Sequence, residues 1–143
     1  MHIRRFATVL TLSCFFSLPA WAQQVIASAA SPGNVLSVEV QFDGGGKLAY
    51  GIKRKGTPII GLSRLGFNLA NAMKLDGGFS LKRQTSSDHD STWEQPWGER
   101  QFVRNRYREL RVEVEQKNRN TRRLAVVFRI YDDGVGFRYE FPD

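Results

Sequence analysis

The chain has 143 residues, a formal net charge of +7 and a single cysteine, Cys14. This length suffices for one domain with a modest core. A lone cysteine excludes an internal disulfide and a cysteine-based metal site, and the moderately basic balance does not by itself indicate nucleic-acid binding.

The first residues have the pattern of a signal peptide. Arg4-Arg5 precedes the apolar run Phe6–Leu18, and Ala20-Trp21-Ala22 places small residues where signal peptidase needs them. The apolar run is shorter than the ~20 residues that a helix needs to span a bilayer, which argues against a membrane anchor. We therefore expect cleavage after Ala22, a periplasmic or secreted product covering residues 23–143, and no transmembrane segment after cleavage.

The next stretch predicts a β-hairpin after an irregular start. Gln23–Asn34 is rich in small and polar residues, typical of a leader or edge segment, so regular structure is expected to begin near Val35. Apolar and polar residues then alternate through Val35–Lys53, interrupted by Asp43–Gly46, which is typical of two strands joined by a glycine-rich turn.

The middle of the chain is less regular. Ile59–Leu62 predicts a short apolar strand, whereas Ser63–Met73 fits neither the helix nor the strand period and predicts an irregular segment or a short strand. Phe79–Gln84 resembles another strand. Thr85–Asp90 is a run of loop-forming polar residues, so we expect a loop there.

The last third predicts long strands and tight turns. Alternating apolar residues indicate strands over Phe102–Gln116 and Leu124–Tyr131, separated by a turn at Asn118–Arg123. Asp132–Gly134 predicts a further turn, after which Phe137, Tyr139 and Phe141 line one face of a final strand. Because no segment after the signal has the period of an amphipathic helix, the expected class is all-β, an antiparallel β-sandwich of seven or eight strands.

Two arginine-rich stretches, Arg100–Arg111 and Arg119–Arg123, could bind nucleic acid or acidic surfaces. The arginines at 104, 106, 108 and 111 largely alternate with other residues, as on the solvated side of a strand. An exported protein rarely meets nucleic acid, so no nucleic-acid partner is expected.

The segment richest in chemistry is Ser91–Glu99, which holds two tryptophans, two carboxylates and a glutamine. Sugar rings stack on indoles and exchange hydrogen bonds with carboxylates and amides, so this mixture fits a saccharide site. Composition favours the alternative, in which Trp93 and Trp97 are core residues and Glu94 and Glu99 pair with nearby arginines.

The sequence shows no catalytic or metal-binding arrangement. Glu94 and Glu99 lie on a loop with no fixed separation, whereas glycosidase chemistry depends on the spacing of its two carboxyl groups. His89 stands between Asp88 and Asp90 and could bind a cation with them, but a solvated loop is the preferred interpretation. We expect no catalytic residue and no metal site in this chain.

Three strings together resemble a known family. Residues 92–99 read TWEQPWGE, residues 103–110 read VRNRYREL, and residues 127–142 read VFRIYDDGVGFRYEFP. With the opening from Ser31-Pro32-Gly33 through Gly51, they resemble the amino-terminal domain of glycoside hydrolase family 97 in order and spacing, over nearly the whole of residues 23–143.

The resemblance implies a large β super-sandwich of which this chain is part, followed by a β/α barrel and a smaller carboxy-terminal β domain. It also implies an exported α-glucosidase or α-galactosidase that commonly uses calcium. The family's catalytic and calcium-binding residues would lie beyond residue 143, so no catalytic residue is carried over. Trp93, Trp97 and Glu99 become candidates for the rim of the substrate pocket or for an interface with the barrel.

The expected function is therefore that of a non-catalytic domain that packs on the barrel of a glycosidase and helps to shape its active site. Whether the chain by itself is an enzyme is left open, because the catalytic domain lies outside it. The alternatives are a free-standing carbohydrate-binding module that uses Trp93 and Trp97, and a structural periplasmic β domain whose arginines contact acidic lipids or polysaccharide.

Overall fold

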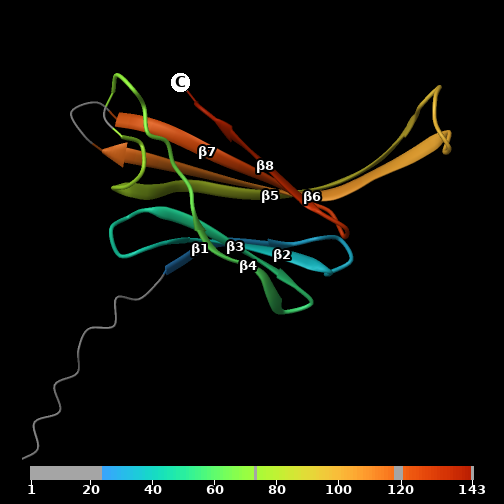
Figure 1. Cartoon of the computed structure of the whole chain (residues 1–143), viewed down its shortest axis with the longest axis horizontal. Coiled ribbons are helices and arrows are strands. Elements are labelled where there is room, and N and C mark those ends of the chain that lie inside the picture. Colours follow the sequence, from blue (N-terminus) through green and yellow to red (C-terminus); the bar gives the residue numbers. More distant parts are fainter. Residues whose placement is uncertain (1–23, 73, 118–120, 143) are drawn as a thin grey trace, which may run out of the picture.

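The computed structural model describes residues 24–72, 74–117 and 121–142, and the predicted signal peptide lies outside these ranges. The described residues form two four-stranded antiparallel sheets, with strand orders β1-β2-β3-β4 and β5-β6-β7-β8 (Figure 1). The strands are β1 Gln24–Ala30, β2 Leu36–Phe42, β3 Leu48–Arg54, β4 Thr57–Arg64, β5 Phe79–Glu94, β6 Phe102–Lys117, β7 Thr121–Ile130 and β8 Val135–Glu140.

The sheets pack face to face, which confirms the predicted all-β sandwich. Strand β1 faces β5 and β6, and β2 faces β7. Over the described ranges, no helix has the length and apolar character needed to cross a membrane.

The first sheet confirms the predicted hairpin and corrects the expected start of regular structure. Strands β2 and β3 pair in an unbroken register from Leu36↔Arg54 to Phe42↔Leu48. Strand β1 pairs with β2 from residue 24 onward, so the expectation that regular structure begins near Val35 is wrong. The alanine and serine residues of β1 produce only a weak alternation of apolar and polar side chains. The segment is a strand because its backbone pairs with the edge of β2.

The second sheet contains the largest departure from the sequence prediction. Strand β5 runs unbroken through Thr85–Asp90, where a loop was expected, and pairs with β6 up to Glu94↔Phe102. The expected strands over Phe102–Gln116 and Leu124–Tyr131 are present as β6 and β7. The turn at Asp132–Gly134 is also confirmed, since the Tyr131 N–H donates to the Gly134 carbonyl at 2.8 Å.

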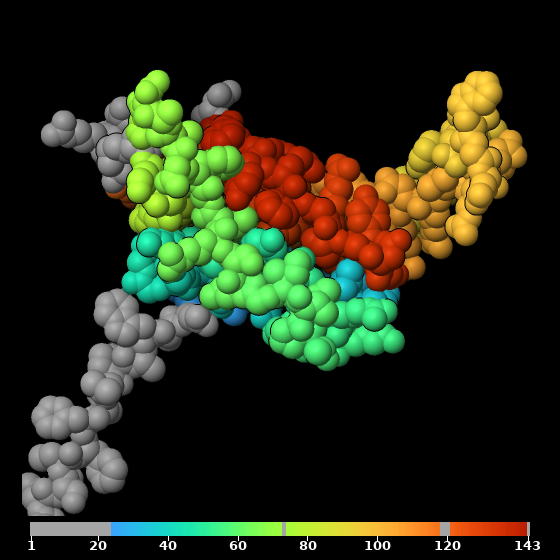
Figure 2. Space-filling model, viewed as in Figure 1, coloured from blue at the N-terminus to red at the C-terminus, as the bar shows by residue number. Residues whose placement is uncertain are grey.

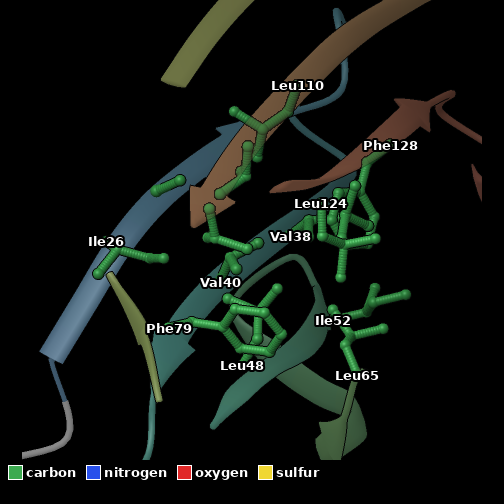
Figure 3. Packing of buried hydrophobic residues seen from close by; sticks show 14 of the residues in the cluster. Ile26, Val38, Val40, Leu48, Ile52, Leu65, Phe79, Leu110, Leu124 and Phe128 are labelled. Atoms are coloured by element: carbon green, nitrogen blue, oxygen red, sulfur yellow. The ribbon is translucent and has the colours of Figure 1, made fainter. Parts of the chain in front are cut away.

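The core lies between the sheets and is made mainly by alternate residues of β2, β3, β6 and β7 (Figure 3). Its largest fully buried apolar side chains are Phe128, Leu48, Leu110, Leu124, Ile130, Val38, Val40, Val112, Val114, Val126 and Val127, although Val127 stands outside the core cluster itself. Phe128 is central: its ring lies 5.7 Å from that of Tyr50 on β3 and 5.5 Å from that of Phe137 on β8. The two sheets are thus held together by packed apolar side chains, as expected for a chain without disulfides.

One side of the sandwich is open. Strands β4 and β8 are the terminal strands of their sheets, and β4 is exposed along almost its whole length. The segment after β4, expected to be irregular or a short strand, is mostly irregular in its described part, with one isolated bridge between Phe67 and Leu75. Phe67 packs its ring against Tyr139 at 4.4 Å and thereby closes part of this side.

Candidate functional site

Strands β5 and β6 extend beyond the sandwich as a two-stranded arm, which we call the ribbon (Thr85–Glu94 and Phe102–Glu109, with the tip loop Gln95–Gln101). Each strand has 16 residues, or roughly 50 Å at about 3.3 Å per residue. Strand β7 accompanies β6 only as far as the pair Arg108↔Ile130, so the ribbon has no third strand beyond that point. Figures 1 and 2 show it projecting from the body of the molecule.

The face of the ribbon that continues the core side of the sheet, its inner face, is covered by ion pairs. Arg108 donates from Nε and Nη2 to the two carboxylate oxygens of Asp88, at 2.6 and 3.0 Å. Arg104 binds Asp90 in the same two-bonded way, at 2.9 and 2.6 Å. These arginine hydrogen bonds lower the pKa of Asp88 and of Asp90 below its usual value.

The opposite face, the outer face, carries the Glu109–Arg129 ion pair where it meets the body, and neutral and aromatic side chains beyond it. The directly opposed pairs on it are His89↔Tyr107, Ser91↔Asn105 and Trp93↔Val103. The His89 and Tyr107 rings are stacked, with centroids 4.7 Å apart and planes 12° apart. Tyr131, at the end of β7, lies beside Tyr107 at 5.1 Å.

The tip loop is fixed by its own hydrogen bonds. The Gln95 backbone N–H donates to the Gln101 carbonyl at 2.9 Å, and the Gln95 side-chain amide donates to the Arg100 carbonyl at 2.6 Å. Gly98 has a φ of 130°, which favours glycine, and a Cβ there would lie 2.8 Å from the Gln95 amide nitrogen. The loop is therefore an ordered turn, and it leaves Trp97 exposed to solvent.

The three site residues predicted from the sequence all lie at this end of the ribbon. Trp93 is 51% exposed and Trp97 is 84% exposed, so the alternative that they are core residues of this chain is wrong. Trp93 is the last residue but one of β5, whereas Trp97 and the exposed Glu99 belong to the tip loop. The structure brings them to the end of the arm that projects from the body (Figure 1).

The predicted partners of the nearby carboxylates differ from those observed. Glu94 accepts a hydrogen bond from the Gln101 side-chain amide at 2.7 Å, and Arg104 pairs with Asp90 instead. His89 points to the face opposite Asp88 and Asp90, because neighbours along a strand alternate sides. The suggested cation cluster at these three residues does not form.

Over the described ranges no group of three or more His, Cys, Asp or Glu side chains could hold a metal ion. The ribbon offers stacking surfaces, hydroxyls and amides. These groups are suited to binding a ligand.

The sequence reasoning missed the outer-face residues Tyr107, Asn105 and Tyr131. The signal that could have found them is the alternation in residues 103–108, where Val103, Asn105 and Tyr107 occupy the positions between the arginines. Reading that alternation as two distinct faces required knowing that Thr85–Glu94 is the partner strand.

Comparison with known proteins supplies the family. The family model described as "Glycosyl-hydrolase 97 N-terminal" matches residues 29–143. The fold is similar to that of a glycoside hydrolase family 97 enzyme from Pseudoalteromonas sp. strain K8 in complex with acarbose, with a TM-score of 0.76 and 30% identity. The same values hold for its E480Q form in complex with panose.

The match covers 81% of this chain but only 17% of the Pseudoalteromonas chain. A crystal structure of a beta-arabinopyranosidase shares the fold, with a TM-score of 0.73 and 24% identity, over 82% of this chain and 18% of that chain. This chain thus spans less than a fifth of the length of the structures it matches.

Proposed function

The chain belongs to glycoside hydrolase family 97, whose amino-terminal domain it matches, and we propose that it is the non-catalytic amino-terminal domain of an exported enzyme that hydrolyses α-glucosides or α-galactosides. The support for a sugar substrate is that the similar Pseudoalteromonas enzyme was obtained in complex with acarbose and with panose. The support for export is the signal-peptide pattern of residues 1–22.

In this proposal the ribbon reaches the catalytic barrel of the complete enzyme, and Trp93, Trp97 and Glu99 lie at the rim of its pocket or in the interface. The observation that carries it is the 84% exposure of Trp97 on a loop held by its own hydrogen bonds. Leaving an indole in water is unfavourable, and a two-stranded ribbon is marginally stable by itself. Both costs are removed when the tip packs against another surface.

Catalysis falls to the barrel in this proposal. The complete enzyme is proposed to use calcium, which is what the family resemblance implies, with ligands supplied by other parts of that enzyme. The role left to this domain is to support the barrel and to complete the shape of the pocket.

The test is to capture the native product from a periplasmic fraction with an antibody against residues 35–141 and to measure both its intact mass and its activity. We expect a species several times larger than 16.3 kDa that hydrolyses nitrophenyl α-glucoside or α-galactoside. A stable species that ends at residue 143 and cleaves neither substrate would contradict the proposal and favour the free-standing binding or structural domain.

The role of the tip is tested in the complete enzyme by replacing Trp97 with alanine. A residue at the pocket rim should raise KM for the hydrolysed glycoside, and an interface residue should lower thermal stability. The matched control is Leu69→Ala, an exposed apolar residue on the body of the sandwich. If the two variants had the same KM and the same thermal stability, the proposed role of the tip loop would be refuted.

A further inference from the structure

The distribution of charged and uncharged side chains over the two faces of the sheet reverses where the ribbon leaves the sandwich. On the body, the inner face is the apolar core, and the outer face carries ion pairs such as Arg83–Glu113 and Arg129–Glu109. On the ribbon beyond the pair Ser87↔Glu109, the inner face carries the ion pairs and the outer face carries aromatic and neutral polar groups. The ribbon's outer face is therefore chemically different from the rest of the surface that continues it.

The outer face has a firm aromatic base. Tyr107 is only 6% exposed, because His89 stacks on it, Tyr131 flanks it and the Arg129 guanidinium lies 4.9 Å from its ring centroid. The exposed imidazole of His89 is thus held by stacking against the Tyr107 ring. A flat, immobilised ring facing solvent is a stacking surface that loses little conformational freedom on binding.

Hydrogen-bonding groups surround this base. The Tyr131 hydroxyl donates to Asn105 Oδ1 at 3.2 Å, which fixes the amide and leaves its N–H groups as donors. The Ser87 hydroxyl lies 3.0 Å from His89 Nε2, and Ser91 is exposed on the same face. Donors and acceptors therefore lie beside the rings on one face of one ribbon.

A second exposed ring continues the row. Trp93 follows His89 on the same face, four residues further along β5, which corresponds to about 13 Å of extended strand. Between and beside the two rings stand the neutral side chains of Ser91, Asn105 and Val103, while the Arg129 guanidinium at the Tyr107 end is paired with Glu109. A ligand that matches it is extended and uncharged, with alternating apolar patches and hydroxyls.

We propose that the outer face of the ribbon binds a neutral, linear oligosaccharide, whose sugar rings stack on His89 and Trp93 and whose hydroxyls bond to Asn105 and Ser91. The choice of a sugar rests on the proposed function in a glycoside hydrolase. A protein partner fits less well, because the face offers few aliphatic side chains.

The experiment is to titrate the exported form of the chain with maltoheptaose and to follow binding by tryptophan fluorescence and by the amide shifts of β5 and β6. We expect saturable binding with shifts confined to outer-face residues. Trp93→Ala and His89→Ala should each weaken it by roughly 3- to 10-fold, the range expected for one ring-stacking contact. Tyr131→Phe, which removes only the hydroxyl that holds Asn105, should weaken it less.

The matched control is Phe102→Ala. Phe102 is even more exposed than Trp93 and sits in the adjacent cross-strand pair, but on the inner face, so its loss should leave sugar binding unchanged. Far-ultraviolet circular dichroism and melting curves establish that each variant is folded. No saturable binding up to tens of millimolar sugar, or equal losses in the Phe102 and Trp93 variants, would overturn the inference.

The complete enzyme separates this inference from the proposed function. Hydrolysis by the complete enzyme tests the proposed function, whereas sugar binding that depends on His89, which the proposed function does not use, tests this inference. Protection of His89 and Trp93 from solvent in the complete, sugar-free enzyme would show that another protein segment covers the face, and would overturn the sugar-binding inference alone. Binding by the chain without hydrolysis by its native product would support the inference and refute the proposed function.

Discussion

Ser31, at the chain reversal between β1 and β2, is a fully buried polar residue that links both sheets. Its hydroxyl oxygen accepts hydrogen bonds from the backbone N–H groups of Val35 and Leu36, each at 3.1 Å. Asp132, from the turn between β7 and β8, accepts the Gly33 N–H at 2.8 Å. The hydrogen bond from Ser31 to the Asp132 carboxylate lowers the pKa of Asp132 the most, and the hydrogen bond from the Gly33 N–H lowers it further. One buried hydroxyl and one carboxylate thus fix how this end of the sandwich closes.

Gly66 carries the residue-scale prediction. Its φ is 147°, a conformation that side chains rarely adopt, and an added Cβ would lie 2.8 Å from the Leu75 carbonyl oxygen. Gly66→Ala should therefore lower the free energy of unfolding by about 1–3 kcal/mol, measured by urea denaturation.

The matched control is Gly61→Ala on β4. A Cβ at Gly61 would meet nothing within 4 Å, and its φ is not positive. Its free energy of unfolding should change by less than about 1 kcal/mol. If both substitutions had the same effect, the strain assigned to Gly66 would be refuted.

At the scale of the element, the ribbon is a strand pair held by charge and stacking, with no core beneath it. The sheet gains its hydrophobic stabilisation up to Leu110, the last fully buried apolar residue of β6 before the ribbon. Beyond it, ion pairs replace apolar contacts between the same two strands. Exposed ion pairs contribute little individually, so the ribbon should be the less stable part of the second sheet.

This arrangement predicts that acid loosens the ribbon before the sandwich. The pKa values of Asp88 and Asp90 are lowered in the fold, so their stabilising contribution is present at neutral pH and is lost as the pH falls below the ordinary value of 3.8. Amide exchange protection in residues 85–94 and 102–108 should therefore fall as the pH drops below 3.8, through the lowered pKa values of the two aspartates, while that of β7 persists.

A double variant, Asp88→Asn with Asp90→Asn, should reproduce this loss of protection at neutral pH, and 0.5 M salt (about 4 Å of screening length) should reproduce part of it. The control is Asp133→Asn, an exposed aspartate in the turn after β7. Protection that is unchanged in the double variant would show that stacking alone orders the ribbon.

At the scale of the whole molecule, the open side formed by β4 and β8 dominates. Apolar residues are exposed along both terminal strands or just beyond them: Ile59, Ile60, Leu62, Phe137 and Phe141. Between these strands lies a hollow of about 450 Å³, lined by Leu36, Ile52, Ile59, Ile60 and Val135 together with Arg54 and Asp132–Gly134. Unpaired strands with apolar side chains are sites of self-association.

We therefore expect the exported form of the chain, when isolated, to associate in a concentration-dependent way. Ile59→Lys should shift it toward the monomer, because a charge on an edge strand opposes pairing. Leu69→Lys, which changes an exposed apolar residue outside both edges, should not. Size-exclusion chromatography with light scattering measures both, and a chain that is monomeric at millimolar concentration would refute the expectation.

The amino-acid sequence by itself determined the family, the all-β class and most of the strands. Val38 and Val40, like Leu110 and Val112, alternate with polar residues. Because successive side chains of a strand point to opposite faces and only one face is buried, apolar residues recur at every second position. The turn at Asp132–Gly134 was equally visible, because Asp and Gly favour that backbone conformation.

Only the tertiary structure revealed the strands that lack a hydrophobic period and the residues that they place on the surface. The physical reason is that a strand which buries little apolar surface leaves no alternation in the sequence. Strand β1 and the outer part of β5 bury little apolar surface, so no hydrophobic period marks them, and each becomes a strand by pairing with a neighbour. Trp93 and Trp97 could be assigned to the surface only once that pairing carried them beyond the core. Likewise, the division of the ribbon into a charged and an aromatic face follows from the register between β5 and β6, which neither strand specifies alone.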